Sequence, residues 1–207
     1  NVTCTDDDVA AINVSAISGN TREVGTTATF TIVLNSQPAA DVTIGLSSSN
    51  TAEGTVSPAS VTFTSSTWNV AQTVTVTGVN DVVADGNITY TVIIGAATSA
   101  DPNYNGLNPD DIAVINIDDD QAGVNVFPVS GLTTKEDGST ATFQISLNTA
   151  PVSNVTISFA SSDETEGTVS PTQQVFNNTS WNSPATITIT GVDDLAEDGD
   201  QPYTVTI

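Results

Sequence analysis

Hydrophobic residues in this chain alternate with polar ones along short segments that turn residues separate. In one such segment Phe30, Ile32 and Leu34 fall on one side, and Thr29 and Thr31 fall on the other. A period of two is expected for β-strands that bury one face, and no stretch shows a convincing helical period. The same alternation predicts inward-facing strand residues at Val42, Ile44, Leu46, Val74, Val76, Tyr90, Val92, Ile94, Phe143, Ile145, Leu147, Val155, Ile157, Phe159, Ile187, Ile189, Tyr203, Val205 and Ile207.

The whole pattern occurs twice along the chain. The hexapeptide EGTVSP at 53–58 recurs at 166–171, so the two copies are offset by 113 positions. Upstream the offset is 112, because the three aspartates at 6–8 recur at 118–120. A repeat of this length matches one immunoglobulin-like domain of about 100 residues. The predicted fold is therefore all-β, with two tandem immunoglobulin-like antiparallel β-sandwiches and an additional N-terminal strand.

The register of the repeats sets the expected domain boundaries. Residues 1–8 align with 113–120, so they are equivalent to the last strand of a repeat. We expect residues 9–120 to form a complete sandwich and residues 121–207 to form a second sandwich that lacks its last strand. Two interpretations remain open: the 207 residues are an excerpt from a longer array, or the subunit is self-complementary. In the second, residues 1–8 act as a donor strand for the open sandwich of the next subunit, which gives a homopolymeric filament.

The single cysteine of the chain, Cys4, lies in this N-terminal segment and excludes an internal disulfide. It aligns with Asn116, which the pattern places on a strand. We therefore expect Cys4 to be a small buried residue, with an intermolecular disulfide as the alternative.

The charge of the chain limits its partners. Two Lys and Arg residues stand against 24 Asp and Glu, for a formal net charge of −22. Such a chain is repelled by nucleic acid and by anionic membranes, and its natural partners are cations. No apolar run approaches the length of a membrane span, so no membrane insertion is expected. Near-absence of Lys, absence of His and Met, and abundant Thr and Ser are typical of secreted bacterial surface proteins.

Catalysis has almost no support in the sequence. No histidine is available as a general base, and no nucleophile motif is present. A glycosidase would need two carboxylates about 5–10 Å apart across a cleft. The acids here recur in corresponding loops of both copies, which indicates a structural role rather than an active site. We predict a protein that is not an enzyme, with no catalytic residues.

Three segments together resemble a Calx-beta-type repeat of large bacterial surface proteins and adhesins. They are GSTATFQISL at 138–147, the GTVSP turn, and GVDDLAEDG at 191–199. The resemblance covers essentially the whole chain and implies β-sandwiches that often bind Ca²⁺ at one end. It implies ligands from an early acid, from an acidic loop before the penultimate strand, and from an aspartate run after the last strand.

Carried over residue by residue, the resemblance implies one metal site for each copy. The first copy has Asn80 and Ala84 where carboxylates are expected, so the second site is the richer in charge. In a filament, the N-terminal aspartates complete the second site of a neighbouring subunit. The implied ligands are Glu23, Asp81, Asp85, Asp118, Asp119 and Asp120 in the first copy, Glu136, Asp193, Asp194, Glu197 and Asp198 in the second, and Asp6, Asp7 and Asp8 in the N-terminal segment.

The chemistry of these groups favours calcium among metals. Ca²⁺ takes about 6–8 oxygen ligands, more than one loop supplies, so two acidic segments have to converge. Zinc and copper sites are disfavoured because histidine and paired cysteine are absent. The alternative interpretation is that the acids form a solvated surface that keeps the protein soluble.

These observations predict an extracellular or cell-surface structural protein, a calcium-stabilised subunit of a filament or surface fibre. The alternative is a segment of a longer adhesin array that acts as a stalk beside neighbouring repeats, or as a module that binds carbohydrate or a surface. Such a module needs an exposed aromatic platform, and Tyr104 is the one loop candidate.

Overall fold

The computed structural model describes residues 1–5, 7–194, 196–197 and 199–207, and every regular element among them is a β-strand. The predicted ligands Asp6 and Asp198 lie outside the described residues. The chain divides into two compact units, and the predicted all-β fold with immunoglobulin-like sandwiches is confirmed. Unit 1 comprises Asn1–Asp81 and Asp85–Asp119, and unit 2 comprises Val82–Ala84 and Asp120–Ile207. The described part of the chain contains no helix that could cross a membrane.

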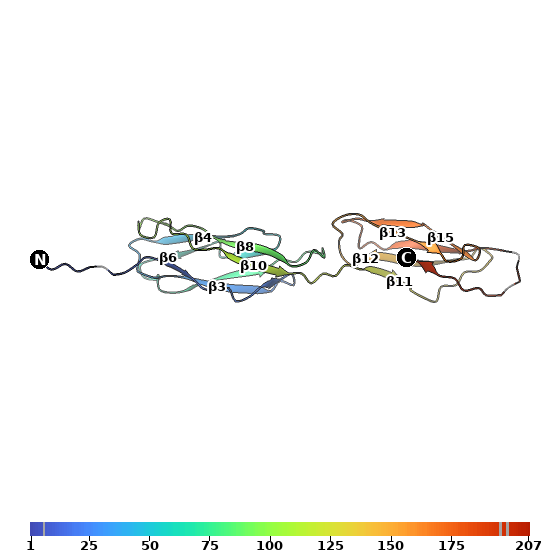
Figure 1. Cartoon of the computed structure of the whole chain (residues 1–207), viewed down its shortest axis with the longest axis horizontal. Helices are drawn as coiled ribbons and strands as arrows, with labels where there is room; N and C mark the ends of the chain where they lie inside the picture. Colours follow the sequence, from blue (N-terminus) through green and yellow to red (C-terminus); the bar gives the residue numbers. More distant parts are fainter. Residues whose placement is uncertain (6, 195, 198) are drawn as a thin grey trace. The chain divides into compact units, whose positions relative to one another are not determined.

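Unit 1 is a sandwich of two sheets (Figure 1). Its strands are β1 (Ile12–Val14), β2 (Thr21–Arg22), β3 (Thr27–Leu34), β4 (Val42–Ser48), β5 (Gly54–Ser57), β6 (Ser60–Phe63), β7 (Gln72–Gly78), β8 (Ile88–Ile94), β9 (Thr98–Ser99) and β10 (Ile112–Ile117). One sheet has the order β1-β3-β7-β5, and the other has the order β2-β10-β8-β4-β6, with β9 also paired to β4. The last strand, β10, runs antiparallel to β8 and parallel to β2.

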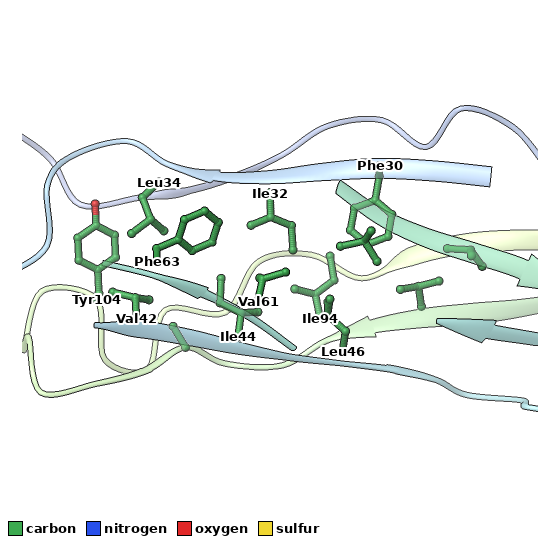
Figure 2. Close-up of a cluster of buried hydrophobic side chains, with 14 of the residues drawn as sticks. Phe30, Ile32, Leu34, Val42, Ile44, Leu46, Val61, Phe63, Ile94 and Tyr104 are labelled. Carbon is green, nitrogen blue, oxygen red and sulfur yellow. The ribbon is translucent and has the colours of Figure 1, made fainter. Parts of the chain in front are cut away.

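The core of unit 1 lies between the two sheets. Buried and less buried residues alternate along β3, so that Phe30, Ile32 and Leu34 all point inward. They face Val42 and Ile44 of β4 across the sandwich (Figure 2). Burial of one face of each strand is the main favourable contribution to folding here, and it follows the alternation seen in the sequence.

Tyr104 closes one end of this core rather than projecting from it. Only 1% of its surface is exposed. Its hydroxyl donates to the Ser36 carbonyl at 2.6 Å and accepts from the Ser36 backbone N–H at 3.0 Å. Figure 2 shows the ring among the core side chains, close to Leu34 and Val42. Tyr104 therefore offers no exposed aromatic platform.

Unit 2 repeats one sheet of unit 1 in full and the other only in part. Its strands are β11 (Val124–Phe127), β12 (Thr140–Leu147), β13 (Val155–Ser158), β14 (Ala160–Ser161), β15 (Gly167–Ser170), β16 (Gln173–Phe176), β17 (Ala185–Gly191) and β18 (Val205–Thr206). The order β11-β12-β17-β15 matches the order β1-β3-β7-β5 of unit 1. The opposite sheet is reduced to the two pairs β13-β16 and β14-β18.

The shortest of these strands marks where the second sheet is incomplete. The alternation predicts a strand through Tyr203, Val205 and Ile207, yet β18 covers only Val205–Thr206. Its counterpart β8 spans Ile88–Ile94 and pairs with β10 along most of that length. Among the described residues of unit 2 no strand takes the place of β10. One edge of β18 therefore has no neighbouring strand to form backbone hydrogen bonds with it.

The described residues of the N-terminal segment form no strand in this chain. Residues 1–5 and 7–9 are exposed, and Figure 1 shows the segment extending from the sandwich of unit 1. The prediction that Cys4 is buried is therefore wrong for the single chain, where the thiol is exposed. Burial of that position depends on strand pairing, and the described residues of the segment pair with no strand here.

Candidate metal centre and open groove

Five carboxylates gather at one end of unit 1, and we call them the acidic pole: Glu23, Glu53, Asp81, Asp85 and Asp118. Carboxylate oxygens of Glu53, Asp81 and Asp85 lie within 4.8 Å of one another, and an oxygen of Glu23 lies within the same distance of Asp81. Glu23 follows β2, Glu53 precedes β5, and Asp81 and Asp85 lie in the loop between β7 and β8. Segments far apart in the sequence thus converge on one point.

Asp118 joins this pole from the end of β10. Its Oδ2 accepts a hydrogen bond from the Gly86 backbone N–H at 2.7 Å, and its own N–H donates to Asn87 Oδ1 at 3.1 Å. These contacts attach the acidic loop to the last strand. Partial desolvation and the negative charges of Asp81 and Asp118 raise the pKa of Asp85 above its usual range. The pole therefore holds mutually repelling carboxylates, an arrangement that favours a bound cation.

Glu53 belongs to this pole although the sequence analysis did not select it. Its side chain is 6% exposed, and Oε2 accepts from Asn116 Nδ2 at 3.3 Å. The Asn116 amide also donates to the Val79 carbonyl at 3.0 Å and accepts from the Thr21 hydroxyl at 3.0 Å. The residue could have been found from the repeated hexapeptide EGTVSP, in which an acid precedes the glycine in both copies.

The donor set of the acidic pole fits a hard divalent cation. Every member is a carboxylate, the ligand type that Ca²⁺ prefers. Glu23 and Glu53 are 2% and 6% exposed, and charges as buried as these are paired or coordinate metals. Backbone carbonyls and water would supply the remaining ligands of a calcium ion. The pole can therefore hold Ca²⁺ in a structural role.

Apart from Asp120, the other predicted ligands are not gathered in this way. In unit 2, Glu136, Asp193 and Glu197 are exposed and Asp194 is half-buried, and the described acids of that unit form no group of three within the distance found in unit 1. Asp7, Asp8 and Asp119 are exposed. The second copy is richer in loop carboxylates, but the structure assembles its acidic pole in the first copy, where β10 brings Asp118 to the loop.

Unit 2 contains an open groove at the place that β10 occupies in unit 1. The groove has a volume of about 1220 Å³, and its described lining includes Val126, Phe143, Ile189, Tyr203 and Val205 on the apolar side. In unit 1 the counterparts of the last two, Tyr90 and Val92, are 2% and 0% exposed, because Val114 of β10 packs in the same core. Tyr203 and Val205 are only half-buried.

The rim of this groove presents backbone groups for pairing. The Thr204 carbonyl accepts from Ser162 N–H at 2.8 Å, and the Thr204 N–H donates to Ser162 Oγ at 2.9 Å. Thr204 therefore faces β14. Backbone groups of successive strand residues point to opposite sides, so those of Tyr203 point toward the groove. The matching residue of unit 1, Tyr90, pairs with Val114 of β10.

No family model and no curated protein matches the chain. Solved structures similar to it include CBD12 from CALX1.2, with 14% identity, a TM-score of 0.39, and coverage of 90% of this chain and 75% of that one. The YadV chaperone has 12% identity and a TM-score of 0.37 over 90% and 88% of the two chains. Domains 5-6 of the S-layer protein SbsC have 15% identity and a TM-score of 0.30 over 90% and 86%. At these identities and scores the similarity is distant and concerns the β-sandwich fold alone.

Proposed function

We propose that this chain is an extracellular structural protein, a calcium-stabilised subunit whose copies join head to tail into a filament. Residues 1–8 of one copy enter the open groove of unit 2 in the next copy and complete its second sheet. The observation that carries this proposal is the equivalence between that groove and the position of β10 in unit 1, together with the alignment of residues 1–8 with 113–120.

A strand is the occupant that the groove fits best. The edge of β18 beside the groove carries backbone groups that a strand can pair with, and exposed edges of this kind drive strand addition. The donor and acceptor surfaces lie on different parts of the chain, so the contact is heterologous and does not close on itself. Repetition of the contact produces an open filament. The alternative, in which a neighbouring repeat of a longer array fills the groove, predicts beads on a string with no self-assembly.

Calcium has a structural role in this proposal. The acidic pole of unit 1 concentrates five carboxylates in a chain of net charge −22, and a divalent cation would offset their repulsion. Calcium sites of extracellular modules have Kd values of about 10⁻⁴–10⁻³ M. We place a second site at the joint between copies, where Asp6, Asp7 and Asp8 of the donor would lie beside Asp193, Asp194, Glu197 and Asp198 of the acceptor. No catalytic step is part of this function.

Electron microscopy of the purified chain tests the assembly. In millimolar Ca²⁺ we expect unbranched filaments, and light scattering after size exclusion should show species well above the monomer mass. Deletion of residues 1–8 should give monomers only. A peptide with the sequence NVTCTDDD should bind in the empty groove of the deletion variant. Added to the intact protein, the same peptide should stop filament growth, because it occupies the groove that the next copy needs.

Two outcomes would contradict the proposal. Filaments that persist after the deletion would show that another surface joins the copies. A full chain that stays monomeric in millimolar Ca²⁺, even at high protein concentration, would favour the interpretation that it is part of a longer repeat array.

A further inference from the structure

We infer that the open groove accepts residues 1–5 of a second copy in a single register, with Val2 and Cys4 pointing inward and Cys4 seated beside Thr134 and Tyr203. This inference rests on the proposed function and specifies the interface that the filament uses. It assigns a binding position to the one cysteine of the chain, which is exposed in the single copy.

Unit 1 supplies the template for this register. In β10 the side chains of Val114 and Asn116 are buried, at 2% and 1% exposure, and the alternate residues are more exposed. The offset of 112 that relates the N-terminal segment to β10 places Val2 at the position of Val114 and Cys4 at that of Asn116. Thr3 then takes the outward position of Ile115. The two inward positions of the donor are thus its valine and its cysteine.

The backbone of unit 2 is compatible with this pairing. In unit 1, Val114 lies opposite Tyr90 and Ile115 lies opposite Thr89. Transferred to unit 2, Val2 lies opposite Tyr203 and Thr3 lies opposite Pro202. Pro202 has no N–H to donate, but it is two residues from Thr204, whose backbone faces β14. Its missing N–H therefore points away from the donor and removes no hydrogen bond between the copies.

In unit 2, polar groups surround the position that corresponds to the side chain of Asn116 in unit 1, and we call these groups the polar niche. In unit 1 the Thr21 hydroxyl hydrogen-bonds with the Tyr90 hydroxyl at 3.1 Å and donates to Asn116 Oδ1 at 3.0 Å. Unit 2 reproduces the first pair, because Thr134 Oγ1 and Tyr203 Oη lie 2.6 Å apart.

The backbone at the other side of the niche has the same hydrogen bond in both units. Val192 N–H donates to the Glu166 carbonyl at 3.0 Å, as Val79 N–H does to the Glu53 carbonyl at 2.9 Å. The Val192 carbonyl is therefore the counterpart of the acceptor that Asn116 uses. A thiol is a weak donor and a weak acceptor, so Cys4 can donate to Val192 and accept from Thr134.

A pair of substitutions tests the register. Val2→Asp places a charge in the apolar groove and should abolish filaments, whereas Thr3→Asp places the same charge on the outward face and should leave them intact. A slip of one residue exchanges the two faces of a strand, so a shifted register would reverse these results. Failure of both variants, or tolerance of both, would also overturn the inference. Cys4→Asn, which restores the side chain of β10, should retain assembly.

The thiol itself provides a second readout on the full chain. In filaments, Cys4 should react with a maleimide about tenfold more slowly than in the monomeric Val2→Asp variant, because the strand has to open first. Thr134→Cys, oxidised with diamide, should form a ladder of disulfide-linked copies on a non-reducing gel, whereas the control Thr133→Cys should not.

These measurements separate the two proposals. Filaments in which Cys4 reacts as fast as in the monomer, and which give no ladder, would overturn the register and leave the assembly in place. Absence of filaments from the unmodified chain would overturn the proposed function and this inference with it.

Discussion

Asn116 Nδ2 and Glu53 Oε2 form a hydrogen bond of 3.3 Å in which both side chains are buried. Asn116 belongs to the last strand of the sandwich and Glu53 to the turn before β5, so the bond links opposite sheets. It also fixes the orientation of one carboxylate of the acidic pole. The last strand of unit 1 therefore positions the acidic pole as well as completing a sheet.

Substitution Glu53→Gln tests the acidic pole as a calcium site. The amide oxygen still accepts from Asn116, but the charge next to Asp81 and Asp85 is lost. At a free Ca²⁺ concentration 100 times the Kd, binding stabilises the unmodified fold by about 2.7 kcal/mol. For a domain of this size that raises the melting temperature of unit 1 by about 10 °C or more. We expect Glu53→Gln to lose at least half of this shift, measured by thermal unfolding in Ca²⁺ and in chelator.

The control for this experiment is Asp41→Asn, which removes one negative charge directly before β4, whereas Glu53 follows the opposite end of that strand. It should leave the calcium-dependent shift unchanged. An unmodified protein whose melting temperature is the same in Ca²⁺ and in chelator would remove the calcium site altogether. Equal losses in both variants would indicate a general effect of net charge.

The glycine of the repeated hexapeptide gives a prediction about packing. A Cβ added to Gly54 would overlap the ring of Tyr90, and Gly167 stands in the same relation to Tyr203. Gly54→Ala should therefore destabilise unit 1 by about 1–3 kcal/mol, the usual cost of overpacking a core. Gly45→Ala is the matched control, because a Cβ there meets nothing within 4 Å. Equal stability of the two variants in urea unfolding would contradict the packing argument.

The sequence predicted the strands well because burial of one face imposes a period of two on the residue types. Phe30, Ile32 and Leu34 follow it, and so do their counterparts in the second copy. The same pattern cannot reveal a buried acid. Glu53 lies in a turn, and its burial depends on β10, which is more than 50 positions further along the chain.

The environment of a strand residue likewise depends on its partner. Cys4 aligns with the buried Asn116 but is exposed, because no described strand of its own chain pairs with it. Tyr203 follows the alternation, yet the strand there begins only at Val205. Sequence alternation gives the face that a residue presents, whereas the presence of the neighbouring strand decides whether that face is covered.

The hydroxyl of Tyr104 is predicted to stabilise unit 1 rather than to contact a ligand. It is buried and hydrogen-bonded to the backbone carbonyl and N–H of Ser36. Tyr104→Phe leaves those two groups without their partner, which costs about 1–3 kcal/mol. Urea unfolding should show this loss, and any binding to carbohydrate should be unaffected. A variant of unchanged stability would show that water replaces the hydroxyl without loss.

The turn before β15 gives a prediction about pH. The side-chain and backbone groups of Thr165 donate to the Asp163 carboxylate and hold the pKa of Asp163 below its ordinary value of 3.8. The folded state therefore favours the ionised form, so this group contributes stability above pH 3.8 that is lost as the pH falls through the lowered pKa. At the corresponding position in unit 1, Asn50 Oδ1 accepts from Ala52 N–H at 3.1 Å without any charge.

Asp163→Asn isolates this contribution because the amide keeps the hydrogen-bond acceptor and cannot ionise. The unmodified protein should be more stable than Asp163→Asn near pH 6, and the difference in melting temperature should shrink as the pH is lowered below 3.8. Glu164→Gln removes a charge from the neighbouring exposed residue and serves as the control for net charge. If its difference from the unmodified protein shows the same pH dependence, the effect comes from overall repulsion. In the Thr165→Val variant the hydroxyl that donates to the Asp163 carboxylate is gone. NMR titration of the Asp163 carboxyl carbon in this variant should therefore show a pKa closer to the ordinary value.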